Sequence, residues 1–194
     1  SDVYKRQVSI FIKSYLMILY ILIYHFIFTF NVLLFDRLMN FRGYIMSDNV
    51  VHMKLDGSSK SHSRADIIAR DVESVIDEPI ARGGTNLGLS PTETLVSSLL
   101  GCTNVITHRI MDKMGFTINS LDIKSKTLFN KDGASLVQEV DIPFPEITLD
   151  IDISTDASEN DLIEVKKQLA MYCPIGKVIR NSGTVINENW NKIN

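Results

Sequence analysis

The sequence predicts an α+β fold with a meandering, mostly antiparallel sheet. Short runs that alternate apolar and polar residues lie on both sides of one long helical stretch. That stretch has capping residues at both ends, and two further helical stretches come before a last strand. The expected order is β-β-α-β-β-α-α-β, which is typical of an α+β domain.

The first strands are expected in the run VVHMKL, at 50–55, and at 66–76. A turn at 57–61, rich in glycine and serine, separates the two runs. The stretch DEPIARGGTNLGLSP then carries glycines and prolines that favour a connector shaped for close backbone approach.

The clearest helix begins after Ser90, which is followed by Pro91 and, three residues after the cap, by Glu93. This pattern is a capping box with proline at the first helical position. Apolar residues recur at helical spacing until Gly115, which ends the helix. Small residues on one face would let a second backbone pack closely: Ser97, Ser98 and Gly101.

Beyond Gly115 the apolar residues return to a period of two. Strands are expected at 118–128, at 136–140 after a turn at 130–133, and at 147–154, which alternates most cleanly. The remaining elements are a helix capped by Ser158, a short helix that starts at Pro174, and a strand that Gly183 opens.

Residues 1–45 differ in character from the rest of the chain. The stretch 8–35 is long and apolar enough for a membrane helix, but it lacks glycine, alanine and proline. The opening SDVYKRQ resembles translated adapter sequence, and Met46 is a natural start. We therefore interpret 1–45 as non-native upstream translation, with a membrane anchor or signal segment as the alternative, and 46–194 as the folded domain.

Charge and histidine placement exclude several functional classes. The net charge is −3, with both signs interspersed, so no nucleic-acid partner is expected. His52 and His62 have no partner cluster, so neither a metal nor a cofactor is predicted. His108 is expected to be an exposed or neutral helix residue, and Trp190 to close the core or a dimer edge.

The chain has two cysteines, Cys102 in the middle of the long helix and Cys173 directly before Pro174. The start of the following helix should lower the pKa of the Cys173 thiol through the helix dipole. Cys102 would need a nearby cation, for which the candidates are Arg82, Arg64 and Arg70. From the residues alone, two interpretations stay open: inert core thiols or a redox-active pair.

Two motifs resemble the signatures of the OsmC/Ohr family. The stretch DEPIARGGTNLGLSPTETLVSSLLGCTNVITHRIMDKMGF is similar to the family's first-cysteine motif, and MYCPIGKVIRNSG to its Cys-Pro motif. The resemblance covers nearly all of 46–194. It implies an OsmC-like fold and an intertwined homodimer in which sheets wrap paired central helices, with active sites between subunits.

The resemblance also implies a thiol peroxidase that reduces organic hydroperoxides or hydrogen peroxide. Cys102 would attack the peroxide and Cys173 would resolve, with recycling by a lipoyl-type or thioredoxin-type dithiol. The departure is that Thr92 occupies the position of the family's catalytic glutamate. Glu93 is a weak substitute, because an ideal helix places it on the face opposite Cys102. For the activating arginine two candidates remain: Arg64 lies at a suitable distance upstream, and Arg82, which we prefer, lies beside the glycines of the motif.

Two other functions remain open at the sequence level. One is a non-catalytic redox sensor or small-ligand-binding protein on the same fold. The other is a membrane-tethered protein, if 8–35 is genuine. Otherwise the expected location is the cytoplasm, where thiols are kept reduced.

Overall fold

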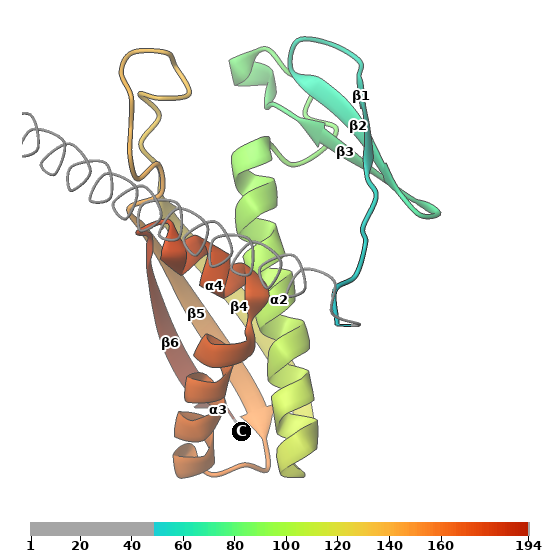
Figure 1. Cartoon of the computed structure of the whole chain (residues 1–194). Helices are drawn as coiled ribbons and strands as arrows, with labels where there is room; N and C mark the ends of the chain where they lie inside the picture. The colour runs from blue at the N-terminus through green and yellow to red at the C-terminus, as the bar shows by residue number, and fades with distance from the viewer. Residues whose placement is uncertain (1–48, 194) are drawn as a thin grey trace, which may run out of the picture. The chain divides into compact units, whose positions relative to one another are not determined.

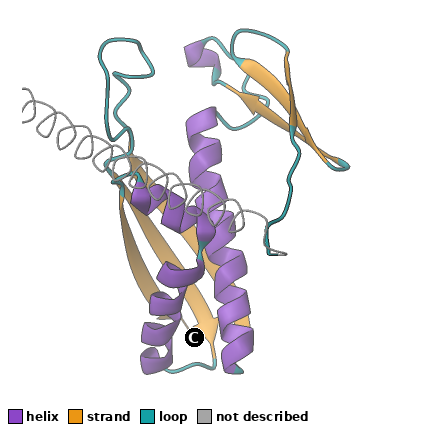
Figure 2. Cartoon of the chain, viewed as in Figure 1, coloured by secondary structure: helices purple, strands orange, loops and turns teal. Residues whose placement is uncertain are grey.

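The structure is a computed structural model that describes residues 49–193. These residues form two three-stranded sheets and three α-helices (Figures 1 and 2). The stretch 8–35 lies outside these residues. Within 49–193, no helix combines the length and the apolar character that crossing a membrane requires. The α+β class and the preference for antiparallel pairing are confirmed, since three of the four strand pairs are antiparallel.

The first sheet differs from the sequence prediction in its strand positions. It contains β1 (Asp56–Ser59), β2 (Arg64–Ala69) and β3 (Val72–Asp77) in that order. The predicted strand at 50–55 is wrong, because 51–55 form no strand. The predicted turn at 57–61 falls largely within β1, and the single run predicted at 66–76 is part of a hairpin that turns at Arg70, whose φ of 59° is left-handed.

The connector and the long helix follow the sequence closely. A short 3₁₀ helix, η1 (Ile80–Arg82), leads to α2 (Pro91–Met114). The Ser90 side chain accepts a hydrogen bond from the Glu93 backbone N–H, and the Glu93 carboxylate accepts one from the Ser90 backbone. Gly115 ends the helix with a φ of 82°. The predicted capping box and glycine stop are therefore confirmed.

The second sheet has the order β4 (Ile118–Leu128), β5 (Glu146–Thr155) and β6 (Val185–Ile193). The strand predicted at 136–140 is wrong, because this stretch is a loop in which Leu136 is exposed. β4 and β5 are antiparallel, whereas β5 and β6 are parallel. The antiparallel meander therefore ends at β5. Two helices connect β5 to β6, and a connection of this length allows β6 to run parallel to β5.

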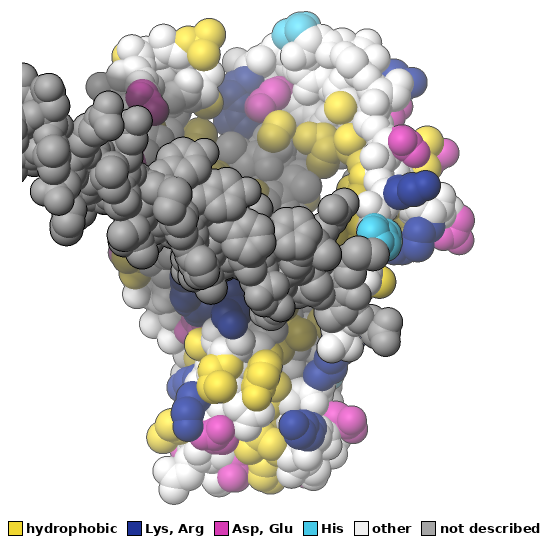
Figure 3. All heavy atoms as spheres, viewed as in Figure 1, with side chains coloured by type: hydrophobic (Ala, Val, Ile, Leu, Met, Phe, Trp, Pro, Cys, Tyr) yellow, Lys and Arg dark blue, Asp and Glu magenta, His cyan; other side chains and the backbone are white. Residues whose placement is uncertain are grey.

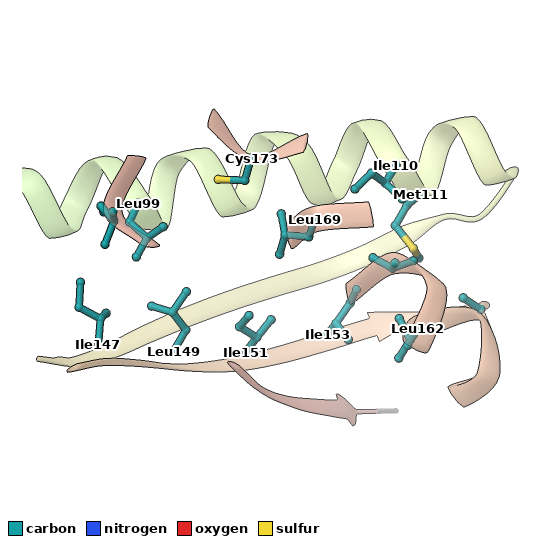
Figure 4. Close-up of a cluster of buried hydrophobic side chains, with 13 residues drawn as sticks. Leu99, Ile110, Met111, Ile147, Leu149, Ile151, Ile153, Leu162, Leu169 and Cys173 are labelled. Atoms are coloured by element: carbon teal, nitrogen blue, oxygen red, sulfur yellow. The ribbon is translucent and has the colours of Figure 1, made fainter. Parts of the chain in front are cut away.

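These two helices are α3 (Glu159–Tyr172), capped by Ser158 as predicted, and α4 (Pro174–Asn181). Together with α2 they cover one face of the second sheet (Figure 1). The core lies in this layer, where β5 contributes every second side chain (Figure 4). Those side chains, each at most 1% exposed, are Ile147, Leu149, Ile151 and Ile153. Trp190 packs against this core from β6.

Candidate active site

The two cysteine sulfurs lie 2.9 Å apart, although the residues are far apart in the chain. Both are free thiols, and the distance exceeds the roughly 2.05 Å of a disulfide bond. Cys102 is the twelfth residue of α2, at the start of its fourth turn. Cys173 is the residue between α3 and α4 (Figure 4). A bond between the sulfurs therefore requires an approach of less than 1 Å or so.

The chain places Cys173 through its local backbone structure. Its N–H donates to the carbonyl of Leu169, which closes α3, and its sulfur accepts the N–H of Gly176, which caps α4. Pro174 at the first position of α4 suits this change of direction, because its fixed φ favours the start of a helix. One residue therefore ends one helix, starts the next and faces α2.

The pKa of the Cys173 thiol is raised to about 11, mainly because the side chain is buried and also because it hydrogen-bonds to Cys102. The expectation of a lowered pKa was therefore wrong. The predicted helix start is present, and the Gly176 N–H does favour the anion, but burial of the thiol outweighs it. Cys173 is a neutral thiol near pH 7.

The two thiols are consequently unequal. Cys173 is 2% exposed and donates its S–H to the sulfur of Cys102, which is only half-buried. An S–H donor supports a negative charge on the accepting sulfur. The arrangement pairs a half-buried cysteine with a buried, protonated one.

The three candidate arginines do not contact either sulfur within residues 49–193. Arg82, in η1, pairs with Glu78 and is largely exposed. Arg64, in β2, pairs with Asp66 at 2.8 Å, and this bond raises the pKa of its guanidinium. Arg70 occupies the β2–β3 turn. All three belong to the first sheet and its connector.

Glu93 also has another partner. Its Oε2 accepts both the backbone N–H and the hydroxyl of Ser90 at 2.8 Å, and these bonds lower the pKa of the carboxyl. The charge of Arg82 contributes more weakly in the same direction. Glu93 and Thr92 line a cavity of about 360 Å³ between α2, β4 and the Phe129–Phe144 pair, a cavity that neither cysteine lines.

Sequence reasoning missed Arg180, on α4. Its Nη2 donates to Glu188 at 2.6 Å, and its positive charge lowers the pKa of Cys173. A signal was available: Arg180 follows Cys173 by two helical turns and Gly176 by one, so the three share a face of α4.

Among the described residues, no group of His, Cys, Asp and Glu side chains could hold a metal ion. His108 is exposed on α2, as expected. The site therefore offers thiol chemistry, built from two sulfurs and the charged pair beside them.

Solved structures show the same fold at low sequence identity. An OsmC-like protein from Mycoplasma pneumoniae is 20% identical with a TM-score of 0.64, over 74% of this chain and 99% of that one. An organic hydroperoxide resistance protein OsmC from Legionella pneumophila is 9% identical with a TM-score of 0.53, over 75% and 98%. One from Elizabethkingia anophelis is 12% identical with a TM-score of 0.54, over 76% and 99%.

A comparison with curated proteins gave no match. The sequence profile of the OsmC-like proteins, in contrast, matches residues 84–189, more than half of the chain. This range contains α2, β4, β5, the first part of β6 and both cysteines. Family-specific sequence and family-specific fold thus agree, and the chain belongs to the OsmC/Ohr family of OsmC-like proteins.

Proposed function

We propose that the protein is a thiol peroxidase that reduces organic hydroperoxides or hydrogen peroxide through Cys102 and Cys173. The observation that carries the proposal is the unequal pair: the sulfur of a half-buried cysteine lies 2.9 Å from that of a buried, protonated one. Membership of the OsmC/Ohr family, which includes organic hydroperoxide resistance proteins, supports a role in oxidative stress.

In the first step the Cys102 thiolate attacks the terminal oxygen of the peroxide. The O–O bond breaks, a S–O bond forms, and the alkoxide or hydroxide takes up a proton and leaves as alcohol or water. Cys102 is oxidised to sulfenic acid as the peroxide is reduced. Its exposure and the S–H bond from Cys173 favour this role for Cys102.

In the second step the Cys173 sulfur attacks the oxidised sulfur of Cys102. A disulfide forms, the S–O bond breaks, and the released hydroxide takes the proton of the Cys173 thiol to give water. A dithiol reductant of the lipoyl or thioredoxin type then reduces the disulfide and is itself oxidised. We place this cycle in the cytoplasm, where such dithiols are available.

Peroxide consumption by the reduced full chain tests this proposal. With cumene hydroperoxide and a dithiol reductant, we expect turnover that Cys102→Ser abolishes. Cys173→Ser should still form one sulfenic acid at Cys102, which dimedone traps, and then stop. Serine is a favoured N-cap, so this substitution preserves the start of α4. Unchanged turnover in Cys102→Ser would falsify the proposal.

A second candidate is a redox sensor that forms the same disulfide without rapid turnover. The observation that favours it is the absence of any arginine contact to Cys102 within 49–193, since a sulfur without a cation beside it attacks more slowly. The same assay separates the two: a sensor forms the disulfide slowly and shows no sustained peroxide consumption.

We also propose that the protein is a homodimer that pairs through α2. Apart from its chain neighbours and the nearby backbone of α2, no heavy atom of residues 49–193 lies within 4 Å of the position that a side chain on Gly101 would take. Val105 is 44% exposed on the same helix. A helix with a small residue beside an exposed apolar one allows close approach of a second helix. Cys102 would then lie beside the subunit contact, where a group of the second copy can complete the site.

A further inference from the structure

Arg180 lies beside the buried thiol because α4 has no side chain at the intervening position. A methyl group on Gly176 would lie 3.0 Å from Nη1 of Arg180 and 3.3 Å from the sulfur of Cys173. The guanidinium and the sulfur therefore border the same small space. Helical side chains lean toward the N-terminus of their helix, so Arg180 extends back over Gly176 toward the cap residue.

The guanidinium is held in this place from β6. Its Nη2 donates to Glu188 at 2.6 Å, and the other oxygen of Glu188 accepts the indole N–H of Trp190 at 3.3 Å. The Glu188 side chain is only 14% exposed and that of Arg180 31%. A partly buried, charge-assisted bond of this kind fixes a long side chain better than a pair in open solvent.

We propose that Arg180, held by Glu188 and admitted by Gly176, is a positioning residue that stabilises the Cys173 anion during its attack on oxidised Cys102. The inference rests on the proposed two-cysteine cycle and concerns its second step. A buried thiol must lose its proton to become a nucleophile, and a fixed positive charge nearby lowers the cost of that loss.

Few other groups compete for this role. Among the described residues, the charged or titratable groups that act on Cys173 are Cys102 from α2 and Arg180 from α4. From β6, Glu188 reaches the sulfur only through Arg180, and α3 supplies the hydrophobic Leu169. Cys102 and burial disfavour the Cys173 anion, whereas Arg180 and the Gly176 N–H favour it.

The test follows the two oxidation steps separately in the full chain after mixing with cumene hydroperoxide. Dimedone-trapped sulfenic acid reports the first step, and loss of free thiol at Cys173 reports the second. Arg180→Gln should leave the first rate within about twofold and slow the second by more than that at neutral pH, because losing the positive charge lowers the thiolate fraction of Cys173. Arg180→Lys should recover part of the loss.

Two matched variants separate charge from structure. Lys177→Gln removes the same charge from an exposed position of the same helix, and both steps should stay within about twofold of the parent. Glu188→Gln breaks the ion pair but keeps the cation, so it should slow the second step less than Arg180→Gln does. If Glu188→Gln and Arg180→Gln slow the second step equally, the ion pair has only a structural role, and the inference is overturned.

Gly176→Ala tests the route by which the guanidinium reaches the sulfur. The added methyl group should displace the end of Arg180 and slow the second step in the parent. In the Arg180→Gln background the same change should slow the second step less than it does in the parent, because the guanidinium that it displaces is gone. Independent, additive effects of the two substitutions would contradict the proposed geometry.

If no sulfenic acid forms, the proposed peroxidase function fails, but the role of Arg180 can still be tested. In the Cys102→Ser background, ultraviolet thiolate absorbance titrates Cys173 as the sole thiol. Arg180→Gln should move this titration to higher pH, and Lys177→Gln should not. An Arg180→Gln titration that coincides with its parent would overturn the inference.

Discussion

Cys173 combines two roles that usually belong to different residues. Its sulfur caps α4 by accepting the Gly176 N–H, and its thiol points at Cys102. Burial dominates the electrostatics, so the helix start does not produce a thiolate. The consequence is a thiol that is protonated near pH 7 and therefore less prone to direct oxidation, which suits the resolving role proposed for it.

The raised pKa of Cys173 predicts a specific pH dependence of stability in the reduced protein. The folded-state pKa of about 11 lies above that of an unfolded thiol, so folding favours the protonated form. This contribution is complete below about pH 8.5 and is lost as pH rises toward the folded-state value. Urea unfolding between these limits should show a decline that Cys173→Ser lacks. A parallel decline in both proteins would contradict the assigned cause.

At the level of elements, the connector between β3 and α2 is held by the side chain of Asp77, the last residue of β3. The Asp77 carboxylate accepts the Thr85 hydroxyl and N–H and the Leu87 N–H, which lowers the pKa of this fully buried group. A methyl group on Gly88 would lie 1.9 Å from the carbonyl oxygen of Val75. Close backbone approach, which the sequence predicted for this connector, therefore requires glycine at position 88.

Gly88→Ala should lower the free energy of unfolding by about 1–3 kcal/mol, because the Val75 backbone must move to admit the methyl group. Gly57→Ala is the matched control: its methyl group would meet only the Ile67 side chain, at an ordinary 3.4 Å. Thermal unfolding of both variants measures the difference. If the two lose equal stability, close backbone approach is not the reason for Gly88.

The elements that the sequence predicts correctly are those whose own residues contain caps or a regular apolar pattern. α2 has a cap at each end, and β5 alternates throughout. The failures depended on distant partners. Residues 50–55 alternate but find no strand to pair with, while β1, an exposed DGSS segment of weak strand propensity, forms because β2 lies beside it. The hairpin at Arg70 lacks the usual glycine or asparagine signal.

At the level of the whole molecule, apolar side chains remain exposed on several helices. Figure 3 shows yellow side chains at the surface in the lower half of the view, and Ile163 of α3 is 63% exposed. The proposed dimer contact is more specific, since it needs α2. Val105→Glu should yield monomers in analytical ultracentrifugation, and Ile163→Glu should not. A parent protein that is already monomeric would refute the dimer.

The sequence indicated which cysteines to examine but not how their environment would be assembled. Periodicity placed Cys102 on a helix and Cys173 at a helix start, and the motif resemblance paired them. Burial of Cys173 depends on packing among α2, α3 and α4, and the position of Arg180 depends on Glu188 from β6. Both are tertiary effects. They explain why the pKa of the Cys173 thiol is raised, whereas the helix start alone predicted a lowered pKa.

In the proposed cycle Cys102 reacts first, and Cys173 then closes an intramolecular disulfide. Peptide mapping of the reduced chain after a stoichiometric pulse of hydroperoxide tests this most directly. We predict a Cys102–Cys173 cross-linked peptide within one molecule, preceded by sulfenic acid on Cys102 alone. Two thiols left reduced, or sulfenic acid that appears first on Cys173, would contradict the account.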